Sequence, residues 1–303
     1  MRRTILAVVI LAAALVNGSV HAATIQFLTP AGSSLGVAYG VDGLNVVGQD
    51  VAQRGFLYNG ATKTYTVIQP PGGGATAARG VSGNTIVGYY IGGGGTHGYL
   101  FDGVNYTSFD HPLGINSTSP WGIDGNNVVG QYVDASKIVH GFIFDGANYT
   151  TLDFPGAKAT RALDISGNLV VGSYEDSKNR THGFVYDGAT WTTLDDPQFM
   201  GTTTAYGIDG SKIVGTADNN STFFGAFIYN GVSYSHPFGI EGGAGQIHQF
   251  FGISGNRIVG TYNDRPFVYV IPEPSTFVLA ALGLLALLPL ARRKRSAASP
   301  PPG

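Results

Sequence analysis

Three histidines, His97, His140 and His182, are well suited to chemistry, because each precedes Gly-Phe or Gly-Tyr at the same position of an internal repeat. Neutral imidazole is a common metal ligand, and several histidines together can form a zinc site. These three belong to separate repeat units, however, and equivalent positions of separate units lie too far apart to share one ion. We therefore predict local hydrogen bonds for each histidine, and no metal.

Acidic residues offer a second chemistry. Asp102, Asp145 and Asp187 each precede a glycine, and Asp-Gly is typical of tight hairpins in which the carboxylate bonds to nearby backbone. Asp195-Asp196 and Asp218 could contribute to a calcium site, but neither lies in an EF-hand loop. We expect these to be solvated at the surface.

The sequence shows none of the familiar catalytic motifs. It contains no cysteine and no Gly-x-Ser-x-Gly elbow. Gly93-x-Gly95-x-x-Gly98 matches a dinucleotide fingerprint in form, but it leads into a predicted strand rather than a helix. We predict a protein that is not an enzyme and needs no cofactor.

The elements that position these residues belong to a six-fold repeat. Each unit contains a Gly-Ile or Gly-Val step, an Asp-Gly or Ser-Gly turn, and a Val-Val-Gly or Ile-Val-Gly run, with one or two exchanges. The runs end at glycines 48, 88, 130, 172, 215 and 260, which are 40 to 45 residues apart. This period is typical of propeller blades rather than of helical solenoids.

Each unit contains four strand-like runs joined by Gly-containing turns. The third, such as 141–146, is apolar on both faces, which is typical of a sheet packed between neighbouring sheets. The sequence thus predicts an all-β fold, a six-bladed β-propeller of about 42-residue repeats over residues 23–270. The repeated glycines of the second strand should leave room for aromatic side chains of the third.

The last unit lacks a fourth strand, because 267–269 run directly into the C-terminal segment. Residues 25–30 resemble 150–155, the fourth strand of another unit. We predict that this N-terminal strand closes the sixth blade, with Phe27 beside Val268, and so removes the open edges. The alternative is a linear stack of sheets.

The first strand of each unit should line the axis of the propeller. Its variable position carries Leu163 in one unit and, in the others, the candidate binding residues Tyr39, Arg79, Trp121, Tyr206 and Phe251. Aromatic rings beside a cation could stack on sugars; alternatively, these residues fill space between the blades. We identify no Asp or Glu near the axis. The loops leading into these strands, of which 238–247 is the longest, should form the ligand face.

Both ends of the chain are typical of export. Arg2 and Arg3 precede an apolar run, which indicates a signal peptide over 1–22. Near the C-terminus, 276–291 are uncharged and precede the basic cluster Arg292, Arg293, Lys294 and Arg295. As a helix the apolar part would rise roughly 22 Å, close to a membrane span. An ordinary C-terminal anchor is one interpretation, and 296–303 should be a disordered tail.

Charge narrows the range of partners. Between residues 23 and 270 lie eleven basic and eighteen acidic residues, a net charge of about −7. A sparsely charged, acidic domain of this kind argues against nucleic acid as a partner.

The C-terminal segment 271–295 resembles the PEP-CTERM sorting signal, because Pro272, Glu273 and Pro274 precede the apolar span and the basic cluster in the order typical of that family. The resemblance implies export in a Gram-negative bacterium, transient retention in the inner membrane, and processing by an exosortase. It also implies an association with cells that make an extracellular polysaccharide matrix.

Residues 97–112, 140–156 and 182–197 resemble the HAF repeat of bacterial extracellular proteins, which implies an extracellular β-repeat protein without an assigned activity. We predict a non-enzymatic surface or matrix component that binds polysaccharide or an envelope protein. The alternatives are a hydrolase or lyase of extracellular glycans, and a structural filler without a ligand.

Overall fold

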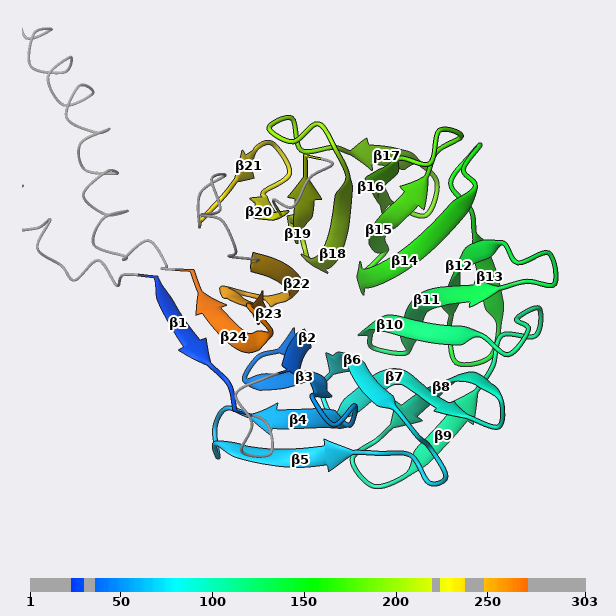
Figure 1. The fold of residues 1–303 in the computed structure, drawn as a ribbon, viewed down its shortest axis with the longest axis vertical. Coiled ribbons are helices and arrows are strands. Elements are labelled where there is room, and N and C mark those ends of the chain that lie inside the picture. Colours follow the sequence, from blue (N-terminus) through cyan, green and yellow to red (C-terminus); the bar gives the residue numbers. More distant parts are fainter. Residues whose placement is uncertain (1–22, 30–35, 220–223, 238–247, 272–303) are drawn as a thin grey trace, which may run out of the picture. The chain divides into compact units, whose positions relative to one another are not determined.

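Six antiparallel sheets of four strands each are arranged in a circle around a central axis (Figure 1). The computed structural model describes residues 23–29, 36–219, 224–237 and 248–271, and within these ranges every regular element is a strand. Residues Ile25–Tyr269 form one compact unit. The predicted six-bladed, all-β propeller is confirmed, and the linear stack is excluded.

Five blades take their strands from consecutive residues. The first contains β2 (Gly36–Asp42), β3 (Asn45–Asp50), β4 (Gly55–Asn59) and β5 (Thr64–Ile68). The second contains β6 (Thr76–Ser82), β7 (Thr85–Gly92), β8 (Gly95–Phe101) and β9 (Tyr106–Phe109). The third contains β10 (Thr118–Asp124), β11 (Asn127–Val133), β12 (Val139–Phe144) and β13 (Tyr149–Leu152). The fourth contains β14 (Ala159–Ser166), β15 (Leu169–Glu175), β16 (Thr181–Tyr186) and β17 (Trp191–Leu194). The fifth contains β18 (Thr203–Asp209), β19 (Lys212–Asp218), β20 (Phe224–Tyr229) and β21 (Tyr234–Ser235).

The sixth blade closes the circle, as predicted. It contains β22 (His248–Ser254), β23 (Arg257–Tyr262) and β24 (Arg265–Val270), and β1 (Thr24–Phe27) is its outer strand. The Leu28 N–H donates to the Pro266 carbonyl at 2.8 Å. The pairing of β1 with β24 therefore joins the two ends of the described chain.

The register of this closure differs by one residue from the sequence alignment, and the prediction that Phe27 lies beside Val268 is wrong. The bond from Leu28 to Pro266 sets Phe27 opposite Phe267. The alignment gives Phe27 the position of Leu152, which is buried in the third blade. In the structure Leu28 is buried, at 1% exposed, whereas Phe27 is 37% exposed and lies under the Arg265 guanidinium at 4.1 Å. Two adjacent apolar residues compete for one buried position, and the smaller, more flexible side chain occupies it.

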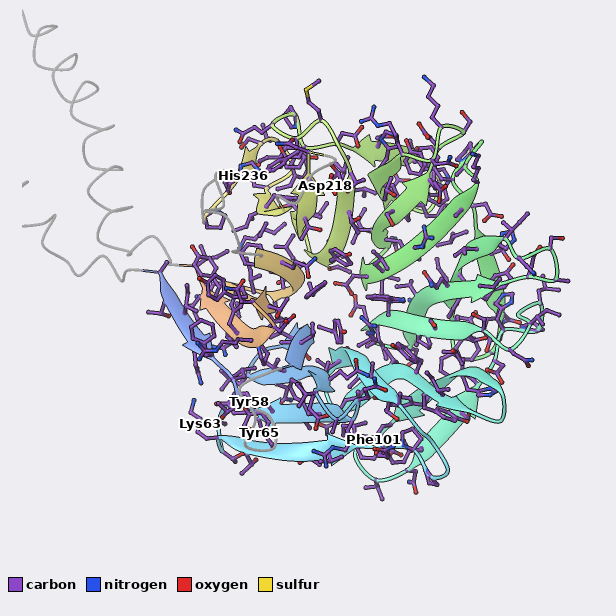
Figure 2. The ribbon with its side chains drawn as sticks, in the orientation of Figure 1. Tyr58, Lys63, Tyr65, Phe101, Asp218 and His236 are labelled. Carbon is purple, nitrogen blue, oxygen red and sulfur yellow. The ribbon has the colours of Figure 1, made fainter. Side chains whose placement is uncertain are left out.

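Tyrosines of the first blade fasten the closing strand from outside. The Tyr65 hydroxyl accepts the Thr29 N–H at 2.8 Å, and the Tyr58 hydroxyl bonds to the Gln26 amide at 3.2 Å. Tyr58 and Tyr65 lie on neighbouring strands with ring centroids 4.7 Å apart (Figure 2). The segment that completes the sixth blade is thus bonded to the first as well.

In the first five blades, a glycine of the second strand faces a large side chain of the third. Gly130 pairs with Phe142, and a Cβ on Gly130 would lie 2.8 Å from that ring, which is fully buried. The same pairing joins Gly48 to Phe56, Gly88 to Tyr99, Gly172 to Phe184 and Gly215 to Phe227. The predicted packing of large against small side chains is confirmed.

A closed circle of hydrogen bonds links the turns between the first and second strands. In each turn an Asp or Ser side chain accepts the glycine N–H of the next blade, at 2.5–3.2 Å. Ser254 of the sixth blade accepts from Gly43 of the first. The acceptors alternate around the circle as Asp42, Ser82, Asp124, Ser166, Asp209 and Ser254.

We expect Leu28→Ala to destabilise the full chain by about 2–4 kcal/mol, because it removes a fully buried side chain from the closing strand. Ile25→Ala, a control on the same strand at a position 48% exposed, should cost less than about 0.5 kcal/mol. Urea unfolding followed by tyrosine fluorescence measures both. Equal effects of the two variants would contradict the closure described here.

Candidate functional site

The candidate binding residues all stand at β-bulges. In every blade the register between the first and second strands skips one residue, as between Pro120 and Gly122 in the third blade. A bulge leaves one residue unpaired and redirects its side chain. The skipped residues are Tyr39, Arg79, Trp121, Leu163, Tyr206 and Phe251. Each blade therefore contributes one of them to the axis.

The structure brings these six residues together around one axial cavity of about 40 Å³. The Arg79 guanidinium lies between two rings, 3.7 Å from the Tyr39 centroid and 3.8 Å from that of Trp121. Phe251 bridges Tyr39 and Tyr206, with centroid separations of 5.4 and 4.9 Å. We call these six residues the axial cluster. Its side chains contact one another, so they fill much of the space at the centre of the propeller as well as line the axial cavity.

One layer further along the strands, five positions are glycine because an added side chain would collide with the next blade. A Cβ on Gly122 would lie 2.6 Å from the Asp164 Cα, and one on Gly252 would lie 2.7 Å from the Tyr39 carbonyl oxygen. The first strands therefore approach one another as closely as backbones can. This layer contains Gly40, Gly80, Gly122, Gly207 and Gly252, and Asp164 in the fourth blade.

Asp164 corrects the expectation that no acid lies near the axis. Its carboxylate lines the axial cavity and accepts the Ile208 N–H of the fifth blade at 2.9 Å. The side chain is half-buried. Burial raises the pKa of Asp164 to about 7, against the opposing effect of backbone hydrogen bonds. In the sequence, the missing glycine of the fourth repeat is the signal that points to this residue.

A second cavity, the vestibule, lies where the first strands end. It has a volume of about 130 Å³ and is lined by Asp42, Asp124 and Asp209 together with Asp164. Asp124 and Asp209 add to the rise in the pKa of Asp164. Each of the three turn aspartates also accepts a glycine N–H from the next blade. These carboxylates therefore hold the blades together and give this end of the axis its acidic character.

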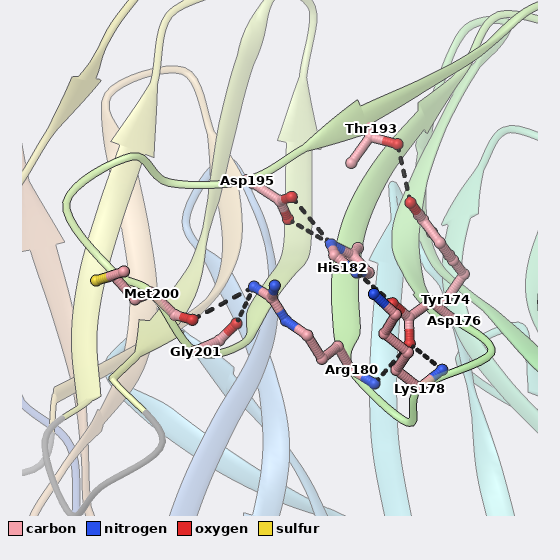
Figure 3. Close-up of polar contacts among 9 residues, drawn as sticks. All are labelled: Tyr174, Asp176, Lys178, Arg180, His182, Thr193, Asp195, Met200 and Gly201. Atoms are coloured by element: carbon pink, nitrogen blue, oxygen red, sulfur yellow. Dashed lines mark hydrogen bonds and ion pairs between the residues drawn. The ribbon is translucent and has the colours of Figure 1, made fainter.

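The three repeat histidines make the local hydrogen bonds that we predicted. Nδ1 of His140 and of His182 bonds to the aspartate after the fourth strand, Asp153 and Asp195 respectively, at 2.9 Å. His182 is also 3.4 Å from Asp176 through Nε2 (Figure 3). Within the described ranges, no group of three or more His, Cys, Asp or Glu residues could hold a metal ion.

His97 faces an acceptor on each ring nitrogen, the Asp110 carboxylate at 2.8 Å and the Gly92 carbonyl at 2.9 Å. The hydrogen bond to Asp110 is the main cause of a raised His97 pKa, which burial partly opposes. In the second, third and fourth blades, the histidine thus joins the third strand to the loop after the fourth.

The Asp-Gly turns behave as predicted. Oδ1 of Asp102 accepts the N–H groups of Val104 and Asn105 at 2.8 and 2.6 Å, and Asp145 and Asp187 make the same bonds. These backbone hydrogen bonds lower the pKa of all three carboxylates.

Two acidic residues that we expected at the surface are buried instead. Asp196 is 1% exposed, and its carboxylate accepts a hydrogen bond from His236 at 2.6 Å. Asp218 is 9% exposed and bonds to the hydroxyl and N–H of Thr202. Asp218 and His236 both belong to the fifth blade (Figure 2). The partner of Asp218 lies 16 residues away in the sequence and that of Asp196 lies 40 residues away, so the local composition gave no sign that these two carboxylates are buried.

Comparison with known families finds the PEP-CTERM protein-sorting motif at residues 270–295. Such a motif implies an exported protein that is anchored in the membrane, processed by an exosortase and then released. No curated protein matches the chain.

Among solved structures, the chain resembles the tricorn protease, at 13% identity and a TM-score of 0.57, over 78% of this chain and 25% of that one. It thus spans about a quarter of the tricorn protease. TolB from Acinetobacter baumannii (14% identity, TM-score 0.47, 82% and 55% covered) and the fucose-specific lectin from Aleuria aurantia (15%, 0.46, 84% and 100%) are also similar. Likeness at these identities shows the fold alone.

Several predictions concern segments outside the described residues. They are the signal peptide 1–22, the loop 238–247, the motif Pro272, Glu273 and Pro274, the apolar span 276–291, the basic cluster 292–295 and the tail 296–303. In the part of the chain that the structure describes, no helix is long and apolar enough to cross a membrane.

Asp164 should make the stability of the protein depend on pH. A folded-state pKa near 7 means that the folded chain binds more protons than the unfolded chain between about pH 4 and 7, so stability falls as pH rises through this range. We expect Asp164→Asn to remove this dependence. The free energy of unfolding of the variant, measured relative to that of the wild type, should therefore rise by about 2 kcal/mol from pH 5 to pH 8.

Urea unfolding of both proteins at the two pH values measures this difference. Asp102→Asn is the matched control, because that carboxylate is exposed and bonded only within its own turn. If wild type and Asp164→Asn responded equally to pH, Asp164 would not be the group responsible.

Proposed function

We propose that the protein is an exported propeller that acts at the cell surface or in the extracellular matrix as a non-enzymatic binding or structural component associated with polysaccharide. The observation that carries this proposal is the place of the sorting motif. It begins at Val270, the last residue of β24. Processing near Pro272-Glu273-Pro274 would therefore release a propeller with all six blades complete.

The proposal extends to both ends of the chain. Residues 1–22 act as a signal peptide, and a helix over 276–291 holds the protein in the inner membrane of a Gram-negative bacterium until processing. The basic cluster 292–295 remains in the cytoplasm, as the distribution of positive charge favours.

We also assign the HAF-type repeat to residues 97–112, 140–156 and 182–197. The hydrogen bonds from His97 to Asp110, from His140 to Asp153 and from His182 to Asp195 support this assignment. They join the beginning of the repeat motif to its Leu-Asp or Phe-Asp end, so each side chain has a structural reason to be present.

Binding of polysaccharide is supported by the composition of the axial cluster. Tyr39, Trp121, Tyr206 and Phe251 offer rings for contact with sugars, and Arg79 adds charge and hydrogen-bond donors. The enclosed space is small, at about 40 Å³. A sugar would therefore contact the cluster from the opening rather than enter the axis.

A glycan hydrolase or lyase is the second candidate, because four carboxylates line the vestibule. Asp164, whose pKa is raised to about 7, shares this cavity with Asp124 and Asp209. A protonated acid near ionised carboxylates is the arrangement that glycosidases use. Against it, Asp124 and Asp209 are already engaged by glycine N–H groups of neighbouring blades.

Sorting is tested by replacing Pro272, Glu273 and Pro274 with alanine in the producing cell. We expect the variant to accumulate as an unprocessed, membrane-associated chain, whereas the wild type is shortened and reaches the surface or the medium. Substitution of Pro300, Pro301 and Pro302 with alanine is the matched control. Equal processing of both variants, judged by fractionation and immunoblotting, would count against exosortase sorting through this motif.

Binding is tested with the purified full-length chain and the extracellular polysaccharide of the producing cell. We expect retention of the protein on the immobilised polymer, with no new reducing ends and no shortening of the polymer over a day. Shortening of the polysaccharide by the wild type but not by Asp164→Asn would show that the protein is an enzyme instead. Absence of retention on any glycan would favour a structural filler.

A further inference from the structure

Arg79 is held in an unusual setting at the axis. Its guanidinium carbon lies against two aromatic rings, 3.7 Å from the Tyr39 centroid and 3.8 Å from that of Trp121, and these two rings are inclined to each other at 77°. The guanidinium also lies 5.3 Å from the centroid of the Tyr89 ring, and its Nη2 makes a long hydrogen bond of 3.4 Å to the Tyr89 hydroxyl. Aromatic rings are weak acceptors, so the group can form strong hydrogen bonds only where its N–H edge meets an oxygen. That edge is the part of arginine that pairs with a carboxylate.

Two donors of the axial cluster have no acceptor in the described part of the chain. They are Nε of Arg79 and Nε1 of Trp121, and both atoms are buried. A buried donor without a partner is unfavourable, because it has lost its hydrogen bonds to water. Donors from neighbouring blades that both lack an acceptor indicate a site for an oxygen-rich ligand.

A second cation lies close by. Arg161 is half-buried, and it is near enough to Tyr206 to oppose, together with Arg79, the rise in the Tyr206 pKa that burial causes. Among the described residues, the arginine paired with a carboxylate is Arg54, whereas neither Arg79 nor Arg161 has a carboxylate within ion-pair distance. The centre of an acidic protein thus contains two arginines whose charge is not neutralised by ion pairs.

Asp164 does not neutralise Arg79, although both line the axial cavity. The Asp164 carboxylate is bonded to the Ile208 N–H, and its pKa of about 7 keeps its negative charge partial near neutral pH. The cavity of about 40 Å³ has room for about three water molecules, or for a group such as a carboxylate, but not for a sugar ring.

From these observations we infer that the axial cluster binds the carboxylate of an acidic sugar, a uronate, with Arg79 as its main partner. The carboxylate enters between the rings and bonds to the edge of Arg79, while the sugar ring remains at the opening against the aromatic side chains. Arg161 attracts the acid by its charge. This inference rests on the proposed association with polysaccharide and names the class of sugar.

The experiment uses the full-length chain in mild detergent and isothermal titration calorimetry at low salt. The probes are tetragalacturonic acid, its methyl ester and inorganic sulfate. We expect the acid to bind at least tenfold more tightly than the ester, and sulfate to bind much more weakly than the acid.

Variants separate the geometry of Arg79 from its charge. Arg79→Lys keeps the charge but loses the planar fork of N–H donors, and it should weaken binding of the acid at least tenfold. Arg161→Gln should weaken it several-fold and make it less dependent on salt. Arg180→Gln, at an exposed arginine of the fourth blade that donates to backbone carbonyls (Figure 3), should leave binding unchanged. If Arg79→Lys does not fold, as judged by its melting temperature, Arg161→Gln provides the test.

Equal binding of acid and ester, or full affinity in the folded Arg79→Lys variant, would overturn the inference while leaving association with other glycans intact. Sulfate binding as tight as that of the acid would also overturn it, because an anion site without sugar recognition would then explain the data. Failure to bind the extracted polysaccharide as well would overturn the proposed function itself.

Discussion

The rest of the structure depends on the crowding of six first strands around one axis. Where they approach most closely, a single Cβ would collide with the backbone of the next blade, as Gly122 and Gly252 show. Five of the six positions in this layer are therefore glycine, and Asp164 of the fourth blade is the exception. Directly before it each strand bulges, and the bulge turns a large side chain into the space at the centre. Close approach of the backbones and the filling of the axis by side chains are two results of the same constraint.

As a consequence, the axis has two levels that differ chemically. Arg79 and the aromatic rings occupy the middle of the strands, and the carboxylates of Asp42, Asp124 and Asp209 occupy the turns. Asp164 lies between them, in place of the glycine that the other five repeats provide. A negatively charged ligand is attracted at the level of Arg79 and repelled at the level of the turn carboxylates. The axial layers thus impose a polarity that the circular arrangement of similar blades would not create alone.

Features that depend on repetition could be predicted from the sequence. The period of the glycines gave the blades, and the missing fourth strand of the last unit gave the closure by β1. The membership of the axial cluster was also predicted, because the same position varies in every unit. Features that depend on one local competition could not be predicted. Phe27 and Leu28 are both apolar, so the alignment did not reveal which of them is buried.

The bulges themselves leave no mark in residue type, since Tyr39, Arg79 and Trp121 share no property that indicates one. Burial of Asp196 depends on His236, forty residues later, and so requires the assembled fifth blade. Asp164 differs from these cases. A break in a strict glycine position was visible in the sequence, and a substitution of that kind inside a repeat merits attention as a site.

Closure by β1 has a consequence for the order of folding. The outer strand of the sixth blade is synthesised first, and its partner β24 begins only at Arg265. At ordinary rates of synthesis the two are separated by roughly 10–50 s. During this interval the Leu28 side chain cannot be buried and β1 has no strand to pair with. The nascent chain therefore carries an unpaired, aggregation-prone strand near its N-terminus. Five blades can assemble before β1 is paired, so the first strand of the propeller to be synthesised is the last to join its sheet.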